Sequence, residues 1–375
     1  MLAVAGLDTL GVADGVTLVE GGVSGLDLDP AGGLVAVTDR GPNADALSAA
    51  GRPAKRFPLP DYRPALLRLS LGPGGARLQT RVPFATPSGA ASGRPVPDAA
   101  GAEVVESAFG PDGEALGPDP WGIDAEGVAA TADGYWVAEE YRPSLWFVGR
   151  DGTVRQRYTP RPVDPNDRPL PPVVLQREAN RGFEGVGVWP SGRVVAALQS
   201  PLLVAAETDV ARLVVLDPAS GASWTLAYRL DGPLRKVGDV AALDEGRLLI
   251  IEHGPLALGG PWSGAVYLLD TRRAERVPDG ALPEAGDAVR LARKTPVLDL
   301  GASGWPAGFE KPEGLAVLDA RTIAVVNDND YGLDSPLGDG AFVATGQPTV
   351  LVRFRLAGPL PGLGRPGDGA GPVLR

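Results

Sequence analysis

Short runs of hydrophobic residues alternate with glycine-containing turns along most of the chain. In five places, two such runs flank a tight turn, as expected for a β-hairpin. The clearest copy runs from Asp124 through the turn Asp133-Gly134 to Glu140. The other copies cover residues 183–200, 238–253, 312–328 and, with a weaker pattern, 24–40. Internal repetition of this kind predicts an architecture built from repeated units.

A further hydrophobic run follows each hairpin, and we expect it to form a third strand of the same unit. These runs are residues 67–70, 145–148, 213–216, 266–269 and 350–354. Units of three to four strands repeated around an axis form a β-propeller. We therefore predict an all-β fold, a single propeller domain over residues 1–375, with six blades favoured and five or seven left open. The run at residues 16–19 is expected to close the ring against the C-terminal strands.

Three segments depart from the repeat. Residues 84–120 are rich in Ala, Gly, Pro and Ser, and we expect them to form an irregular insertion. Residues 159–173 are rich in proline and are expected to be an extended loop. The Gly- and Pro-rich stretch from about residue 359 is expected to be a flexible tail.

The composition excludes several classes of function. A net charge of −11 makes nucleic acid or an anionic membrane a poor partner. The chain contains no cysteine, so disulfides, thiol catalysis and cysteine-bound zinc are excluded. It also lacks a long apolar run, so we expect no membrane span. The expected partner is a small molecule, and the expected oligomeric state is a monomer. The first residues do not form a signal peptide as they stand.

The repeat places polar residues at the start of the first strand and at the end of the second. In an antiparallel hairpin these two positions lie at the same end, opposite the turn. If the hairpins are arranged radially, all five ends face one opening. The carboxylates expected there are Asp39, Glu126, Glu139, Glu140, Glu184, Asp239, Glu252, Glu313, Asp328 and Asp330.

Several ionised carboxylates in one place repel one another, so such a cluster needs protons, basic partners or a divalent cation. Oxygen ligands without His or Cys favour Ca²⁺, with Mg²⁺ or Mn²⁺ as alternatives. An alternative interpretation is that each acid pairs with a backbone N–H or an arginine and fixes its own blade. The predicted metal ligands are Asp39, Glu126, Glu140, Glu184, Asp239, Glu252, Glu313 and Asp328.

Cationic residues lie beside the same strand ends. A calcium cluster flanked by Arg and Lys suits a phosphate, which bridges the metal and the cations. Taken singly, each of these cations is better explained as a surface or ion-pair residue. The chain has one histidine, and it lacks a nucleophile-elbow serine motif and a P-loop. The residues predicted to take part in catalysis are Glu126, Glu184, Arg40, Arg181, Lys311 and His253.

At these motifs the chain resembles the esterase-like phytase family. The resemblance rests on Ser24-Gly25-Leu26 with Asp39-Arg40-Gly41, on Asp124-Ala125-Glu126-Gly127, on Asn180-Arg181-Gly182-Phe183-Glu184-Gly185, on Leu249-Ile250-Ile251-Glu252, and on Glu310-Lys311-Pro312-Glu313-Gly314 with Asn327-Asp328-Asn329-Asp330. It implies a β-propeller, often exported, with phosphoester or esterase activity.

Three positions depart from the family pattern. Gln199 stands where the family usually has an acid, and His253 stands where an arginine commonly follows Glu252. Ser24 replaces the acid that begins the other copies of the repeat. The first two departures reduce the charge at the proposed centre.

The leading hypothesis is a Ca²⁺-dependent hydrolase of phosphoric esters, with its active site at the central opening of the propeller. One alternative is a calcium-dependent lactonase or carboxylesterase, and another is a non-catalytic propeller that binds a ligand or a metal. A small phosphorylated or ester substrate fits the first two. The resemblance implies export with the signal absent from this chain, while a cytoplasmic location stays open.

Overall fold

The structure is a computed structural model that describes residues 2–97, 106–204, 208–280, 282 and 289–363. Within these residues, five sheets, here called blades, follow one another along the chain. Each contains four antiparallel strands, and the second carries a short fifth strand at its outer edge. From the innermost strand outwards, the first blade comprises β4 (Val23–Leu28), β5 (Leu34–Thr38), β8 (Ala65–Gly72) and β9 (Gly75–Pro83), and the second comprises β14 (Ala125–Ala130), β15 (Tyr135–Glu139), β16 (Ser144–Val148) and β17 (Val154–Thr159). The third comprises β19 (Phe183–Val188), β20 (Val194–Leu198), β21 (Val210–Asp217) and β22 (Ala222–Arg229), and the fourth comprises β23 (Lys236–Asp244), β24 (Arg247–Pro255), β25 (Trp262–Asp270) and β26 (Arg293–Asp299). The fifth comprises β27 (Pro312–Asp319), β28 (Thr322–Asn327), β31 (Val350–Arg355) and β1 (Leu2–Ala3).

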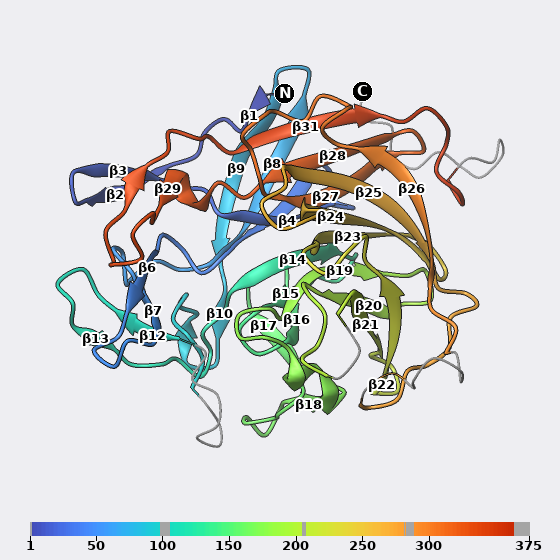
Figure 1. Ribbon diagram of the computed structural model, residues 1–375, viewed down its shortest axis with the longest axis horizontal. Helices are drawn as coiled ribbons and strands as arrows, with labels where there is room; N and C mark the ends of the chain where they lie inside the picture. The colour runs from blue at the N-terminus through green and yellow to red at the C-terminus, as the bar shows by residue number, and fades with distance from the viewer. Residues whose placement is uncertain (1, 98–105, 205–207, 281, 283–288, 364–375) are drawn as a thin grey trace.

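The five inner strands form a closed ring. Strand β4 contacts β14, β14 contacts β19, β19 contacts β23, β23 contacts β27, and β27 returns to β4. Figure 1 shows the blades radiating from the point where these strands meet. The β-propeller prediction is confirmed. The described residues form five blades, a count that the sequence left open beside the favoured six.

Hydrophobic side chains fill the space between every pair of neighbouring blades. Five clusters of buried residues account for the five interfaces, including the one between the last blade and the first. Each cluster combines residues of two sheets, such as Trp146 with Val35 and Tyr267 with Val195. Because burial of apolar area is the main stabilising term, this packing holds the ring together.

Glycines allow the inner strands to approach closely at the axis. A Cβ atom on Gly25 would lie 2.7 Å from the Cα atom of Gly127, and one on Gly127 would lie 2.7 Å from the Cα atom of Gly185. A side chain at these positions would push the strands apart. This explains why a glycine follows Ser24, Glu126, Glu184 and Glu313 in the repeat.

Ring closure differs from the sequence prediction. Strand β1 closes the last blade, because Leu2 and Ala3 pair with Leu351 and Val350 of β31. The run predicted for this role, Val16–Val19, is strand β3, which pairs with β2 (Thr9–Ala13) in a separate hairpin. Its Leu18 is fully buried in a small cluster beside the ring, which anchors the hairpin there.

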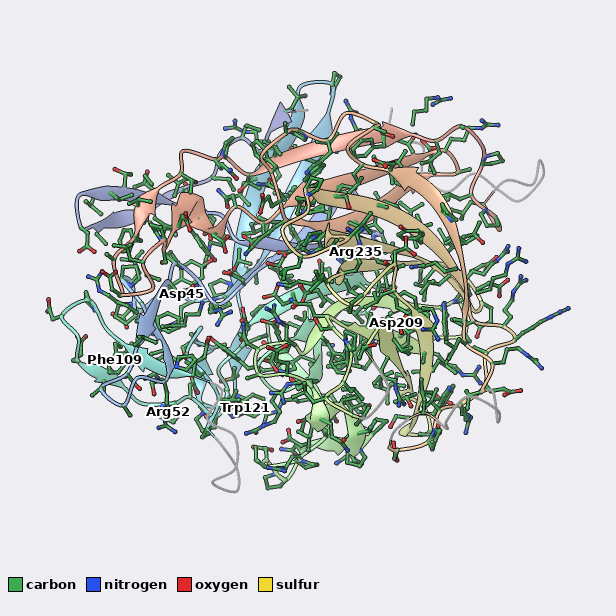
Figure 2. The ribbon with its side chains drawn as sticks, in the orientation of Figure 1. Asp45, Arg52, Phe109, Trp121, Asp209 and Arg235 are labelled. Atoms are coloured by element: carbon green, nitrogen blue, oxygen red, sulfur yellow. The ribbon has the colours of Figure 1, made fainter. Side chains whose placement is uncertain are left out.

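An accessory sheet lies to one side of the propeller. It has the order β13 (Ala115–Leu116), β12 (Ser107–Phe109), β7 (Pro53–Arg56) and β6 (Ala44–Leu47), with β12 parallel to β7. Figure 2 shows Asp45 and Phe109 of this sheet beside the ring. The insertion predicted as irregular at 84–120 thus contains part of a sheet and the short hairpin β10 (Ala85–Thr86) and β11 (Gly89–Ala90), while residues 98–105 lie outside the described residues.

The remaining segments are short. The Pro-rich loop contains β18 (Arg168–Pro169), parallel to β17, and leads into the 3-10 helix η1 (Pro172–Gln176). A second 3-10 helix, η2 (Asp330–Gly332), precedes the hairpin β29 (Leu333–Asp334) and β30 (Val343–Ala344). In the predicted C-terminal tail, Leu360 is buried, and residues 364–375 lie outside the described residues. Neither described helix has the length and apolar character needed to cross a membrane.

Candidate functional site

The first ring of site residues comes from irregularities at the start of the inner strands. In four blades the strand register shifts by one residue there, leaving one bulged residue unpaired. The bulged residues are Ser24, Glu126, Glu184 and Glu313. A bulge re-aims the side chain that it carries. The three glutamates all line the central cavity, as the sequence predicted.

A second ring of site residues lies directly after the second strand of the hairpin in four blades. Asp39, Glu140, Gln199 and Asp328 come directly after β5, β15, β20 and β28, and all four line the same cavity. Their backbone N–H groups donate to equivalent carbonyls at the start of each inner strand, for example Glu140 to Asp124 at 2.9 Å and Asp328 to Lys311 at 2.9 Å. The repeated backbone geometry therefore brings these side chains to one opening.

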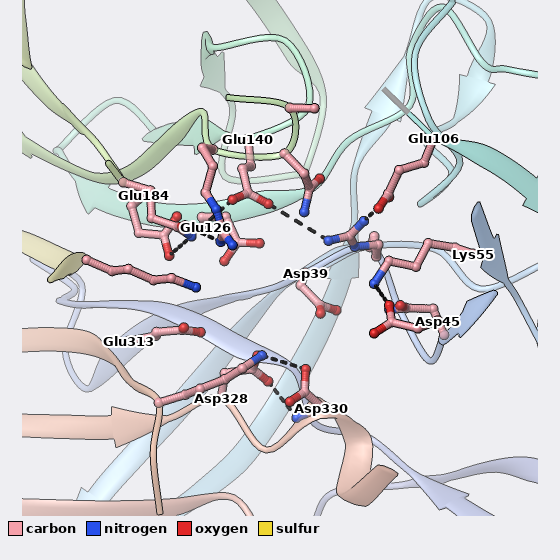
Figure 3. Close-up of a pocket in the computed structure, with 18 residues that line it drawn as sticks. Asp39, Asp45, Lys55, Glu106, Glu126, Glu140, Glu184, Glu313, Asp328 and Asp330 are labelled. Carbon is pink, nitrogen blue, oxygen red and sulfur yellow. Dashed lines mark hydrogen bonds and ion pairs between the residues drawn. The ribbon is translucent and has the colours of Figure 1, made fainter. Parts of the chain in front are cut away.

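The cavity has a volume of about 360 Å³ and lies over the centre of the ring. Figure 3 shows Glu126, Glu140 and Glu184 on one side, Glu313, Asp328 and Asp330 on the opposite side, and Asp39 between them. Nearly every side chain in it is polar. Its walls are formed by Asp39, Arg40, Asn43, Asp45, Lys55, Glu106, Glu126, Glu140, Ala179, Asn180, Arg181, Glu184, Gln199, Lys236, Lys311, Glu313, Asp328 and Asp330.

Several cations of the cavity are already paired with carboxylates. The Arg40 guanidinium lies 2.9 Å from both Asp124 and Glu106. The Lys311 ammonium lies 3.0 Å from Asp328 and 2.7 Å from Asp330. Lys55, from the accessory sheet, pairs with Asp45 at 2.5 Å.

Two cations have no ion pair among the described residues. Arg181 donates a short hydrogen bond to the neutral Gln199 amide oxygen, and Lys236 lies in the cavity wall without a hydrogen-bonded partner among these residues. Burial and the nearby Arg181 lower the pKa of Lys236. These two cations are therefore available to an anionic ligand.

The carboxylates retain protons far above their usual range. Burial, and then the charge of Asp124, raises the pKa of Glu140 to about 8. Burial, with the charges of Asp328 and Asp330, raises the pKa of Glu313 to about 8 although Lys311 opposes the shift. The pKa of Glu126 is also raised, by burial and by four neighbouring carboxylates. A compensating cation would bind here in competition with protons.

One group of carboxylates has a geometry suited to a metal ion. Oxygen atoms of Asp124, Glu126 and Glu140 lie within 4.8 Å of one another, and all three residues are buried. Within the described part of the chain, the Glu126 carboxylate accepts no hydrogen bond, and Glu184 Oε2 is buried without a donor. A set of oxygen ligands at this spacing fits a hard divalent cation such as Ca²⁺. The residues present therefore fit a divalent metal ion.

Asp239 lies outside the cavity because of a register difference. In the fourth blade Gly238 takes the place of the bulged acid, and Asp239 takes the place of the ring glycine. A shift of one residue turns a strand side chain to the other face. The fully buried Asp239 carboxylate accepts hydrogen bonds from the backbone N–H groups of Val240, Leu315 and Leu26, and so joins three inner strands at the axis.

Glu252 also lies outside the cavity. Glu252 pairs with Val237 as Glu139 pairs with Ala125, so the two glutamates occupy equivalent positions. Both side chains point into their blades. Lys294 donates to Glu252 at 2.7 Å, and Ser144 donates to Glu139 at 2.9 Å. Alternation along a strand explains why the residues that follow them, His253 and Glu140, point to the opposite face from Glu252 and Glu139.

His253 stands at the fifth position of the second ring but behind the cavity wall. It is 5% exposed, and its Nε2 lies 3.9 Å from Glu313 Oε1. Burial, and then the positive charge of Lys236, lowers the pKa of His253 to about 3. The neutral ring is thus a poor general base or acid near pH 7, and its predicted catalytic role stays a prediction.

Sequence reasoning did not select some residues of the site. Asp124 and Lys236 occupy the position two residues before Glu126 and Gly238, so the spacing of the repeat was a usable signal. Asp45, Lys55 and Glu106 reach the cavity from the accessory sheet and its flank, and no repeat marks them.

Backbone strain is concentrated at the cavity. Among the described residues, four other than glycine have positive φ, and Asn180 (54°) and Asp330 (47°) of these line the cavity. A third, Tyr331 (57°), follows Asp330 directly. Residues held in the left-handed region cluster at binding and catalytic sites. Two of these four positions therefore lie in the cavity wall, and a third lies beside it.

Among solved structures, the chain is similar to the PQQ-bound aldose sugar dehydrogenase from Streptomyces coelicolor, with 13% identity, 93% of this chain and 98% of that chain covered, and a TM-score of 0.30. It is similar to a calcium structure of a family AA12 carbohydrate-active enzyme from Trichoderma reesei, with 10% identity, coverage of 88% and 96%, and a TM-score of 0.33. At these TM-scores the likeness carries no argument about activity, and the fold rests on the strands described above.

The comparison with curated proteins gave no match. The comparison with protein families gave a match to the phytase-like family, described as "Esterase-like activity of phytase", over residues 19–331. These residues include all five inner strands and the whole second ring of site residues. The chain therefore belongs to the phytase-like family.

Proposed function

We propose that the protein is a Ca²⁺-dependent hydrolase of phosphoric esters that acts in the central cavity. The observation that carries the proposal is the combination, in one cavity, of an oxygen-only cation site with two unpaired cations, Arg181 and Lys236. A phosphate needs both kinds of partner when a metal bridges it to the protein. Membership of the phytase-like family supports the same class of reaction.

The carboxylates would hold the cation. Glu126 and Glu140, with Asp124 behind them, supply the closest set of oxygen atoms. When bound, a divalent cation polarises a phosphoryl oxygen and lowers the pKa of a bound water. Gln199 donates to Glu140 at 3.1 Å and to Glu184 at 2.8 Å, and so fixes the orientation of both carboxylates.

The cations would hold the phosphoryl group and stabilise the charge that develops on its oxygens. Arg181 and Lys236 are free of carboxylate partners among the described residues, whereas Arg40 and Lys311 are held by ion pairs. Arg40 and Lys311 therefore act mainly by fixing Asp124 and Asp328. Export and a monomeric state stay predictions beside this proposal.

Calcium titration by calorimetry on the wild type and on Glu126→Gln tests the cation site. Removing one charged ligand is expected to weaken calcium binding at least about tenfold, which corresponds to a loss of about 1.4 kcal/mol of binding free energy. Phosphomonoester hydrolysis should fall in parallel. Glu245→Gln, a partly exposed glutamate away from the cavity, is the matched control and should change neither quantity.

The substrate class needs a separate comparison. The calcium-loaded protein should hydrolyse phosphomonoesters faster than lactones or carboxylic esters of the same alcohol. The reverse preference would support the carboxylesterase alternative, which the family description keeps open. Unchanged calcium affinity in Glu126→Gln would remove the metal assignment.

A further inference from the structure

A second hollow adjoins the central cavity. It has a volume of about 490 Å³ and lies over the third and fourth blades. Arg181 and Lys236 line both hollows, so the two share a wall made of cations. The rest of the second hollow is formed by residues 200–204, which follow β20, by residues 233–235, which precede β23, and by Glu178 and Thr208.

The second hollow is more apolar than the central cavity, because apolar residues make up half of its lining. Leu203 and Leu234 line it and are 71% and 37% exposed. Pro201, Pro233 and the partly buried Val204 extend the apolar surface. Neighbouring exposed apolar side chains beside a polar site are typical of a ligand-binding surface.

Hydrogen bonds hold the two loops in place. The Leu203 N–H donates to the Gln176 carbonyl at 2.7 Å. The buried Arg235 guanidinium donates to the carbonyls of Glu252 and Ser263, both at 2.7 Å, and Figure 2 shows Arg235 near the middle of the ring. The apolar surface is therefore formed before a ligand arrives, which lowers the entropic cost of binding.

The number of unpaired cations limits the charge of the ligand. Lys55 pairs with Asp45, Arg40 with Asp124, and Lys311 with Asp328. Among the described residues of the cavity, this leaves the guanidinium of Arg181 and the ammonium of Lys236 without ion pairs. Two cations and a metal ion suit a ligand with one phosphate group better than a ligand with several phosphate groups.

We infer that the substrate is an amphiphilic phosphoester, whose single phosphate lies against Arg181 and Lys236 and whose aliphatic chain lies along Leu203 and Leu234. This rests on the proposed function, because it places the phosphate in the central cavity. The ester substituent leaves the cavity over the shared wall of cations. The apolar hollow then removes part of the chain from water.

Calorimetry of methylphosphonate and octylphosphonate binding to the calcium-loaded protein tests the inference, at concentrations below micelle formation. Each methylene that leaves water strengthens binding about fourfold. Octylphosphonate is expected to bind about 30-fold or more tightly than methylphosphonate. Leu203→Ser and Leu234→Ser should each reduce octylphosphonate affinity about fivefold to tenfold and leave methylphosphonate affinity unchanged.

Val12→Ser is the matched control, because Val12 is 67% exposed on β2 in the separate hairpin, and it should change neither affinity. Thermal melting verifies that the variants are folded. Equal binding of the two phosphonates overturns the inference and leaves the proposed function standing. Binding of neither overturns the proposed function and the inference with it. Loss of methylphosphonate binding in the leucine variants also overturns the inference, since the leucines would then act on the phosphate.

Discussion

At the residue scale, the site depends on which carboxylates have a partner. Asp239 and Glu252 are satisfied by backbone N–H groups and by Lys294, and they stabilise the blades. Glu126 and Glu313 accept no hydrogen bond from the described residues and face the cavity. A buried carboxylate without a partner is costly to ionise, so these two residues favour either a proton or a bound cation.

The single histidine provides a test of the burial that the structure shows. With a pKa of about 3 in the folded protein, against about 6.5 when unfolded, His253 should stay neutral at pH 7 and well below it. NMR of its ring should show no titration between pH 8 and pH 5. Because no other histidine is present, the signal is unambiguous.

The burial of His253 also makes the stability of the folded protein depend on pH. The unfolded protein binds a proton on His253 between pH 6.5 and about 3 and the folded protein does not. This residue therefore costs stability as the pH falls through that window, by up to roughly 4 kcal/mol at its acid end. A ring that titrates near pH 6.5 would instead place His253 in contact with solvent and revive a role as a proton carrier.

At the element scale, a bulge and a glycine recur at the start of the inner strands. The bulge aims an acid at the cavity, and the glycine allows the next strand to pack against the backbone. A Cβ on Gly185 would lie 2.5 Å from the Val240 backbone nitrogen and 2.8 Å from the Asp239 carbonyl carbon. Backbone cannot rotate away as a flexible side chain can, so the two strands would have to separate.

Gly185→Ala is therefore expected to lower the free energy of unfolding by roughly 2 to 3 kcal/mol, through overpacking at the axis. Urea denaturation at a fixed calcium concentration measures the effect. Gly117→Ala is the control, because no atom lies within 4 Å of the Cβ position of this exposed glycine and its φ is not positive. Equal stability of the two variants would show that the ring is less tightly packed than the contacts indicate.

At the scale of the whole molecule, the ring concentrates charge. The walls of the cavity carry nine carboxylates and five lysine or arginine side chains, within a chain of net charge −11. Burial, and then the charge of neighbouring carboxylates, raises their pKa values, and a divalent cation would relieve the repulsion. Metal binding and stability are therefore coupled.

Without metal, stability should fall as the pH rises from 6.5 to 8.5. Glu140 and Glu313 have pKa values of about 8 when folded and about 4.3 when unfolded, so only the folded state holds these protons in that window. The loss is expected to be roughly 2 kcal/mol for each of the two groups. Melting curves in EDTA and in calcium measure it, and the stabilisation by calcium should be larger at pH 8.5 than at pH 6.5. If the stability of the metal-free protein rose with pH, the raised pKa values of Glu140 and Glu313 would be contradicted.

The sequence by itself determined the hairpins, the third strands and most of the cavity. The copy from Asp124 to Glu140 and its four relatives all form the expected strand pairs, and Glu126, Glu184, Glu313, Asp39 and Asp328 all reach one opening. These features are local, because turn residues and alternating hydrophobic positions fix a hairpin within a few residues.

Only the tertiary structure decided the features that depend on distant pairing. The ring of five blades, its closure by β1 rather than by residues 16–19, and the entry of Asp45 and Lys55 from the accessory sheet all depend on segments far apart in the chain. The faces on which Asp239 and Glu252 lie depend on register, and a shift of one residue reverses the face without changing the local pattern. Hydrophobic alternation predicts that a strand forms, but the packing between blades determines which partner it meets and which side chains reach the centre.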